Sequence, residues 1–148
     1  LGTLFRPAVT TYTRAFVQSE ALAVEKHLAA FAMQQGLPTE VCRPDLVADV
    51  YVINPQVIND RTRYPTTKNQ VADRWALYDP MPEARGRAAI LVTDRTSSAI
   101  DSMLLAHELA HFAEERRCWS AHWKGTSESL ALEFQESYGW FRFGRSFE

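Results

Sequence analysis

The segment from about Ser98 to Cys118 constrains the fold more than any other part of the chain. Drawn as a helix, it carries apolar residues on nearly every side, and such a helix has to be surrounded by other elements. We therefore expect a buried, central helix. Two groups of side chains support this: Ile100, Met103 and Leu104 share one face with two histidines, and Leu105, Leu109 and Phe112 cover much of the rest.

Three polar residues interrupt this apolar helix in the stretch HELAH, namely His107, Glu108 and His111. Residues four apart lie on one face of a helix, so both imidazoles point to one spot. Zn–N bonds of about 2.0–2.1 Å can span their separation. Glu108 lies beside that spot, where it can take a proton from a water molecule bound to the metal. An ordinary structural helix is the alternative, but burying three unpaired polar groups costs on the order of several kcal/mol.

The other elements follow from periodicity and from helix and strand boundary signals. Gly36 and Pro38 end a first helix, whose isolated His27 we interpret as structural or solvated. Grouped strands followed by helices predict a single α+β domain over residues 1–148. The expected elements are a helix over 19–35, strands over 47–53, 74–78 and 88–93, the buried helix, and a last helix from Thr126 or Ser127 to about Phe143.

Composition narrows the class of protein. The chain is 46% hydrophobic and 23% charged, which is typical of a soluble globular protein. Its net charge is −2, and its Lys and Arg residues form no long cluster, so we do not expect nucleic-acid binding. No apolar run approaches the ~18 residues of a membrane span, and the opening residues do not resemble a signal peptide.

Cys42 and Cys118 are the two cysteines of the chain. They are too few to form a metal site, and neither belongs to a CxxC motif. They are either one disulfide or two separate buried thiols. A disulfide would indicate an oxidising compartment, that is, a secreted or periplasmic protein.

HELAH resembles the zinc-binding motif of the zincin metallopeptidases, and the apolar strand over 88–93 just before the helix also fits that family. The metzincin branch requires Gly and His where this chain has Glu114 and Arg117, so that branch is excluded. The size is similar to the compact minigluzincins. This resemblance implies an N-terminal helix and a small, mostly antiparallel sheet packed on the HExxH helix, and one Zn²⁺ per chain. It also implies a peptide or protein substrate that pairs with an edge strand, for which 88–93 is the candidate. The apolar content of 88–93 suits an ordinary core strand equally well.

A catalytic zinc takes three protein ligands, so a third one is expected downstream of HELAH. The buried helix is expected to continue for about eight residues, or ~12 Å, beyond His111. A last helix packed antiparallel on it reaches the level of the histidines only after a similar length. Glu128 then comes before that level, whereas Glu133 and Glu136 lie far enough along the last helix. Gluzincins often carry this ligand as Asn-Glu-Gly-Phe-Ala or Glu-Gly-Leu-Ala-x-Tyr. The run Gln135-Glu136-Ser137-Tyr138-Gly139 is similar, with a small residue three positions after Glu136. Glu136 therefore ranks first, then Glu133, then Glu128, then His122 or an aspartate.

Three functions stay open at this point. In the first, the chain is a zinc peptidase in which Glu108 acts as general base on the metal-activated water. In the second, it is a zincin-fold binding or regulatory protein that retains zinc but is catalytically limited or latent. In the third, the helices form a structural pair without a metal. A peptidase also needs a group that stabilises the oxyanion, for which His122 and Tyr138 are examples.

Overall fold

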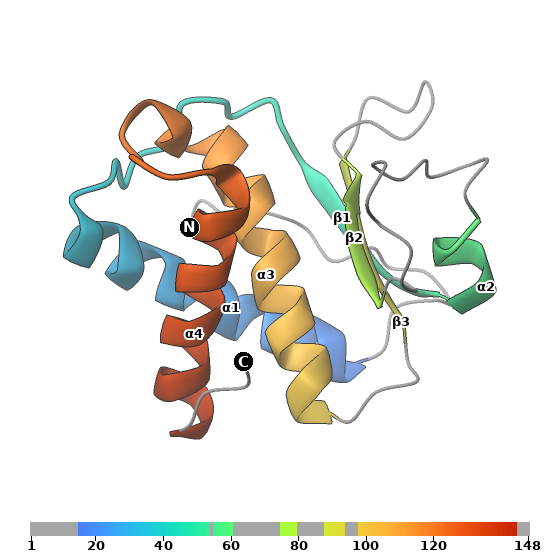
Figure 1. The fold of residues 1–148 in the computed structure, drawn as a ribbon. Coiled ribbons are helices and arrows are strands. Elements are labelled where there is room, and N and C mark those ends of the chain that lie inside the picture. The colour runs from blue at the N-terminus through green and yellow to red at the C-terminus, as the bar shows by residue number, and fades with distance from the viewer. Residues whose placement is uncertain (1–14, 54, 61–74, 80–87, 94–97, 145–148) are drawn as a thin grey trace.

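The computed structural model describes residues 15–53, 55–60, 75–79, 88–93 and 98–144. Within these residues the chain forms three long helices and a three-stranded sheet (Figure 1). The elements in order are α1 (Ala15–Gln35), β1 (Ala48–Ile53), α2 (Pro55–Ile58), β2 (Ala76–Asp79), β3 (Ala88–Thr93), α3 (Ser98–Arg116), the 3₁₀ helix η1 (Trp119–Ala121) and α4 (Ser127–Phe143). The expected α+β class is confirmed.

Helix α3 lies at the centre of the molecule, as its apolar sequence predicts. It packs on α1 and α4 on one side and on β2 and β3 on the other (Figure 1). Its apolar side chains are buried on several faces, including Met103, Leu105, Leu109 and Phe112. The residues of HELAH are therefore held in a helix that neighbours fix from most directions.

The sheet is mixed, which corrects the expectation of a mostly antiparallel sheet. Its strand order is β1-β3-β2; β1 pairs with β3 in parallel, and β2 pairs with β3 antiparallel. The prediction that residues 88–93 form a substrate-binding edge strand is wrong, because β3 is the central strand. All six of its residues are buried. Its unbroken apolar sequence suits a strand covered on both faces, whereas β2 is only half-buried and lies at the edge.

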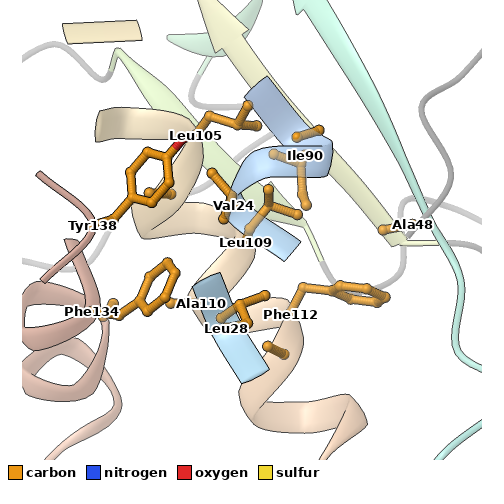
Figure 2. Packing of buried hydrophobic residues seen from close by; sticks show 14 of the residues in the cluster. Val24, Leu28, Ala48, Ile90, Leu105, Leu109, Ala110, Phe112, Phe134 and Tyr138 are labelled. Atoms are coloured by element: carbon orange, nitrogen blue, oxygen red, sulfur yellow. The ribbon is translucent and has the colours of Figure 1, made fainter. Parts of the chain in front are cut away.

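The main core fills the space between the sheet and the helices (Figure 2). Val24 and Leu28 of α1 and Phe134 of α4 pack around Leu109 and Ala110 of α3. The opposite face of the sheet has its own small cluster, formed by Ile58, Ala89 and Leu91. Successive residues of β3 thus point alternately into the two clusters, as the pleat of a strand requires.

The helix ends agree with the boundary signals in the sequence. Gly36 adopts a positive φ of 69°, and the N–H of Leu37 donates to the carbonyl of Ala32 at 2.8 Å, which closes the end of α1. Thr126 caps α4, because its hydroxyl accepts the N–H of Ser129 at 3.0 Å. The start of α4 is therefore fixed by its cap.

Cys42 and Cys118 form a disulfide, with 6.1 Å between their Cα atoms. The bond anchors the end of α3 to the segment after α1. The carbonyl of Arg116 strengthens the same junction, since it accepts the backbone N–H groups of Cys42 and Arg43 at 2.9 and 3.0 Å. The disulfide points to an oxidising compartment. No described helix is long and apolar enough to cross a membrane.

His27 is a structural residue of the core, which is one of its two expected roles. Its ring is buried, and its Nε2 lies 2.8 Å from the Ser137 hydroxyl oxygen. The ring stacks on Phe141 at a centroid distance of 4.7 Å and lies near Phe134. Burial lowers the pKa of His27, which favours the neutral form of the ring.

Candidate metal centre

Two histidines of α3 and one glutamate of α4 converge on one point. The Nε2 of His107 lies 3.2 Å from Oε2 of Glu128, and the Nε2 of His111 lies 3.3 Å from Oε1 of the same carboxylate. One ligand atom from each of the three residues lies within 4.8 Å of the others. This group could hold a metal ion. Among the described residues, it is the one group of His, Cys, Asp or Glu side chains with this geometry.

The antiparallel packing of α4 on α3 brings these residues together. Ser127, at the start of α4, contacts Glu114 near the end of α3. Gln135, two turns further along α4, contacts His107 near the middle of α3. Glu128, in the first turn of α4, therefore lies over the stretch of α3 that carries both histidines.

Hydrogen bonds fix the tautomer of each ring. The Nδ1–H of His107 donates to Oε1 of Gln135 at 2.8 Å, because an amide oxygen can only accept. The Nδ1–H of His111 donates to the hydroxyl of Ser127 at 3.0 Å, and that hydroxyl donates in turn to a carboxylate oxygen of Glu114. In the neutral form of both rings, Nε2 therefore carries a lone pair and faces Glu128.

Three acceptor atoms thus face one another, which fits a cation. Burial and the neighbouring His107 lower the pKa of His111, although Glu128 and Glu114 act in the opposite direction. A tetrahedral zinc ion with bonds of about 2.0–2.1 Å separates its ligand atoms by about 3.3–3.4 Å. Oε1 of Glu128 lies 3.3 Å from the Nε2 atoms of both His107 and His111, which matches this value. Two imidazoles and one carboxylate are also a donor set that zinc prefers.

Glu108 lies next to this group and faces strand β2. The backbone N–H of Tyr78 donates a hydrogen bond to its carboxylate. Burial raises the pKa of Glu108 to about 7; Glu128 adds to the rise, while His107 and the N–H of Tyr78 oppose it. A carboxylate with a pKa near neutrality can both accept and release a proton at physiological pH.

The third member of the group differs from the one that the sequence ranked first. Glu128, ranked third, lies with the histidines, whereas Glu136 and Glu133 lie outside the group. On α4, Gln135 lies on the same face as Glu128. Glu136 and Glu133 lie about 80° and 140° away from Glu128 around the helix axis. Helix α3 ends at Arg116, five residues after His111, so the return along α4 is shorter than the eight residues expected from the sequence.

The other candidates lie away from the histidines. His122 is exposed and belongs to the turn after η1, outside the metal group. Tyr138 is buried, and its hydroxyl donates to Glu20 of α1 at 2.9 Å, so it does not serve as an oxyanion stabiliser. Ser127, Gln135 and Glu114 were not singled out from the sequence. The seven-residue spacing of Glu128 and Gln135, which is two helical turns, is a signal that points to Gln135.

A pocket opens beside His111. Its volume is about 250 Å³, and it lies between the edge strand and the junction of α3 with α4. The residues that line it are Tyr78, His111, Glu114, Glu115, Ser120 and Ser127. The metal group therefore borders a hollow that is large enough to admit a side chain of a ligand.

No protein-family model, curated protein or solved structure with which the chain was compared matches it.

Proposed function

We propose that the protein is a zinc-dependent peptidase that resembles the gluzincins, with His107, His111 and Glu128 as its zinc ligands. One observation carries the proposal: two Nε2 lone pairs and a carboxylate converge at 3.2–3.3 Å. Because the Nδ1–H groups of both rings donate elsewhere, both Nε2 atoms are left facing the Glu128 carboxylate, where a bound cation would be shared by all three groups. This assignment replaces Glu136 with Glu128.

Glu108 is the proposed general base. His107, His111 and Glu128 would hold a zinc ion, which would supply Lewis acidity and would lower the pKa of a water molecule to about 7. The carboxylate of Glu108 takes the proton of the attacking water and passes it to the amine that leaves. The backbone N–H of Tyr78 holds this carboxylate against β2.

The outer edge of β2 is the proposed binding site for the peptide backbone of a substrate. The carbonyl of Trp75 accepts the N–H of Thr93 at 3.0 Å, so residues 75, 77 and 79 direct their backbone groups toward β3. Ala76 and Tyr78 direct theirs to the other side, where the N–H of Tyr78 already meets Glu108. An extended peptide that pairs along this edge passes directly beside the general base.

Glu108→Gln tests the mechanism most directly. We expect this variant to bind zinc as the wild type does, because Glu108 is not among the three proposed ligands. We expect the rate of hydrolysis of an unstructured protein or of a peptide library to fall by about 10²–10⁴-fold. Glu133→Gln is the matched control, since it makes the same change at an exposed position of α4 and should keep full activity.

Two outcomes would oppose the proposal in different ways. Full activity of Glu108→Gln would remove Glu108 from the mechanism. A folded, zinc-loaded wild type that cleaves nothing across a broad peptide library would support the alternative, a zinc-retaining binding or regulatory protein.

A further inference from the structure

Each proposed histidine ligand is held from behind by a side chain of α4. We propose that Ser127 and Gln135 are positioning residues that set the zinc affinity of the site, and that Glu114 acts on His111 through Ser127. The inference rests on the proposed metal site and extends it to three residues that do not touch the metal. It makes α4 both the source of one ligand and the support of the other two.

The support of His111 is a chain of two hydrogen bonds. Its Nδ1–H donates to the Ser127 hydroxyl at 3.0 Å, and this hydroxyl donates to Oε1 of Glu114. Glu114 is 8% exposed. A buried carboxylate that ends the chain orients the Ser127 proton toward itself, which leaves the serine oxygen free to accept from the ring. The ring is thereby fixed in the tautomer whose Nε2 binds a metal.

The support of His107 is a single hydrogen bond to Oε1 of Gln135, at 2.8 Å. Gln135 is half-buried and lies on the α4 face that also carries Glu128. The two imidazole rings are 5.0 Å apart and inclined by 71°, so each ring is held in a different plane. Two independent supports are needed because neither ring orients the other by stacking face to face.

The two supports differ in charge, and this difference makes the inference specific. His111 is linked through Ser127 to a carboxylate, whereas His107 meets a neutral amide. A carboxylate behind a ligating histidine raises the basicity of the ring more than an amide does, and loss of such a partner typically weakens metal binding by about 10–100-fold. We therefore expect the loss of the Ser127 hydroxyl to weaken zinc binding more than the loss of the Gln135 amide.

The test is the dissociation constant of zinc, measured by competition with a chelator of known affinity. The variants are Ser127→Ala, Gln135→Leu and Gln135→Glu. Ser127→Ala and Gln135→Leu each remove the acceptor of one ring N–H. Gln135→Glu keeps an acceptor for the Nδ1–H of His107 and gives it a negative charge. Ser129→Ala is the matched control. It removes a hydroxyl from the same turn of α4, and that hydroxyl bonds to Thr126 and Trp123 instead of a histidine.

A second readout needs neither metal nor activity. Long-range ¹H–¹⁵N correlation spectra of the metal-free protein report which ring nitrogen carries the proton. We expect the Nδ1–H tautomer at His107 and His111 in the wild type and in Ser129→Ala. We expect a mixture of tautomers at His111 alone in Ser127→Ala and at His107 alone in Gln135→Leu.

The expected result is about 10–100-fold weaker zinc binding in Ser127→Ala, a smaller loss in Gln135→Leu, and wild-type or tighter binding in Gln135→Glu and Ser129→Ala. Wild-type affinity in both Ser127→Ala and Gln135→Leu would overturn the inference and leave the proposed zinc site intact. A folded wild type that binds no zinc would instead overturn the proposed function itself.

Discussion

Helix α4 carries two polar clusters, and they are built on opposite principles. Near its start, Glu128 meets His107 and His111 of α3. Near its end, Tyr138 and Arg142 meet Glu20 of α1. The Tyr138 hydroxyl and the Arg142 guanidinium donate to the Glu20 carboxylate, each at 2.9 Å.

The two clusters differ in their balance of donors and acceptors. Burial alone would raise the pKa of Glu20, but hydrogen bonds from Arg142, Tyr138 and Ser102 lower it overall. The Glu20 carboxylate is therefore satisfied by hydrogen bonds from within the protein, and these bonds join α1, α3 and α4. In the metal group, by contrast, the facing atoms are all acceptors when both rings are neutral. Hydrogen-bond donors around a buried carboxylate thus stabilise the packing of helices, whereas acceptor atoms that converge on one point favour the binding of a cation.

Zinc should stabilise the protein through the metal group alone. At a free zinc concentration of 1,000 times the dissociation constant, we expect about 4 kcal/mol of additional stability, which a chelator removes. Thermal unfolding with zinc and with chelator measures this difference. Glu20→Gln should keep the zinc-dependent increment and Glu128→Gln should lose it. An unchanged melting temperature of the wild type with and without zinc would argue against a metal site.

Loss of the Glu20 cluster should lower the stability of the metal-free protein but leave zinc binding unchanged. Glu20→Gln removes the charge that Arg142 and the Tyr138 hydroxyl share, so the free energy of unfolding should fall by about 1–3 kcal/mol. Urea unfolding of the metal-free protein measures the loss, with exposed Glu133→Gln as its control. The zinc content of Glu20→Gln should match that of the wild type. A zinc-free but stable Glu20→Gln variant would contradict the separation of the two clusters.

The pH dependence of stability should separate the two histidine environments from Glu20. Burial lowers the pKa values of His27 and His111 from 6.5, so the unfolded chain takes up protons at a higher pH than the folded one. Metal-free stability is then complete well above pH 6.5 and falls as the pH drops through 6.5 toward the lower pKa values of the folded rings. The pKa of Glu20 is lowered from 4.5, so its contribution is lost only as the pH falls below about 4.5.

Urea unfolding between pH 4 and pH 8 measures this profile. In His27→Gln, which can still bond to Ser137, the decline below pH 6.5 should be shallower than in the wild type. An identical profile in this variant would remove His27 from the explanation.

Local signals predicted the elements of the fold well. The sequence of α3 required burial on all sides, and the strand over 88–93 and the start of α4 at Thr126–Ser127 were confirmed. Strand order could not be read in this way, because it depends on which distant segments pair. Both edge and centre positions are compatible with a short apolar strand, so the sequence alone does not show that β3 is central and that β2 lies at the edge.

Only the part of the candidate site that lies within one helix could be predicted from the sequence. The positions of His107, Glu108 and His111 on one helix follow from their spacing alone. The third member depends on where α3 ends and on how α4 is rotated about its own axis. Neither quantity is set by residues near HELAH, so the ranking favoured Glu136, whose neighbours resemble a family motif, over Glu128. The supports Ser127 and Gln135 depend on the same rotation.

The most direct test of the metal group is the metal content of the purified, folded protein by elemental mass spectrometry. The samples are wild type, Glu128→Gln, Glu133→Gln and Glu136→Gln, each incubated with zinc and freed of excess. We predict about one zinc per chain in the wild type and in the Glu133 and Glu136 variants, and loss of zinc in Glu128→Gln. Zinc retained in Glu128→Gln but lost in Glu136→Gln, or no zinc in the wild type, would contradict the account.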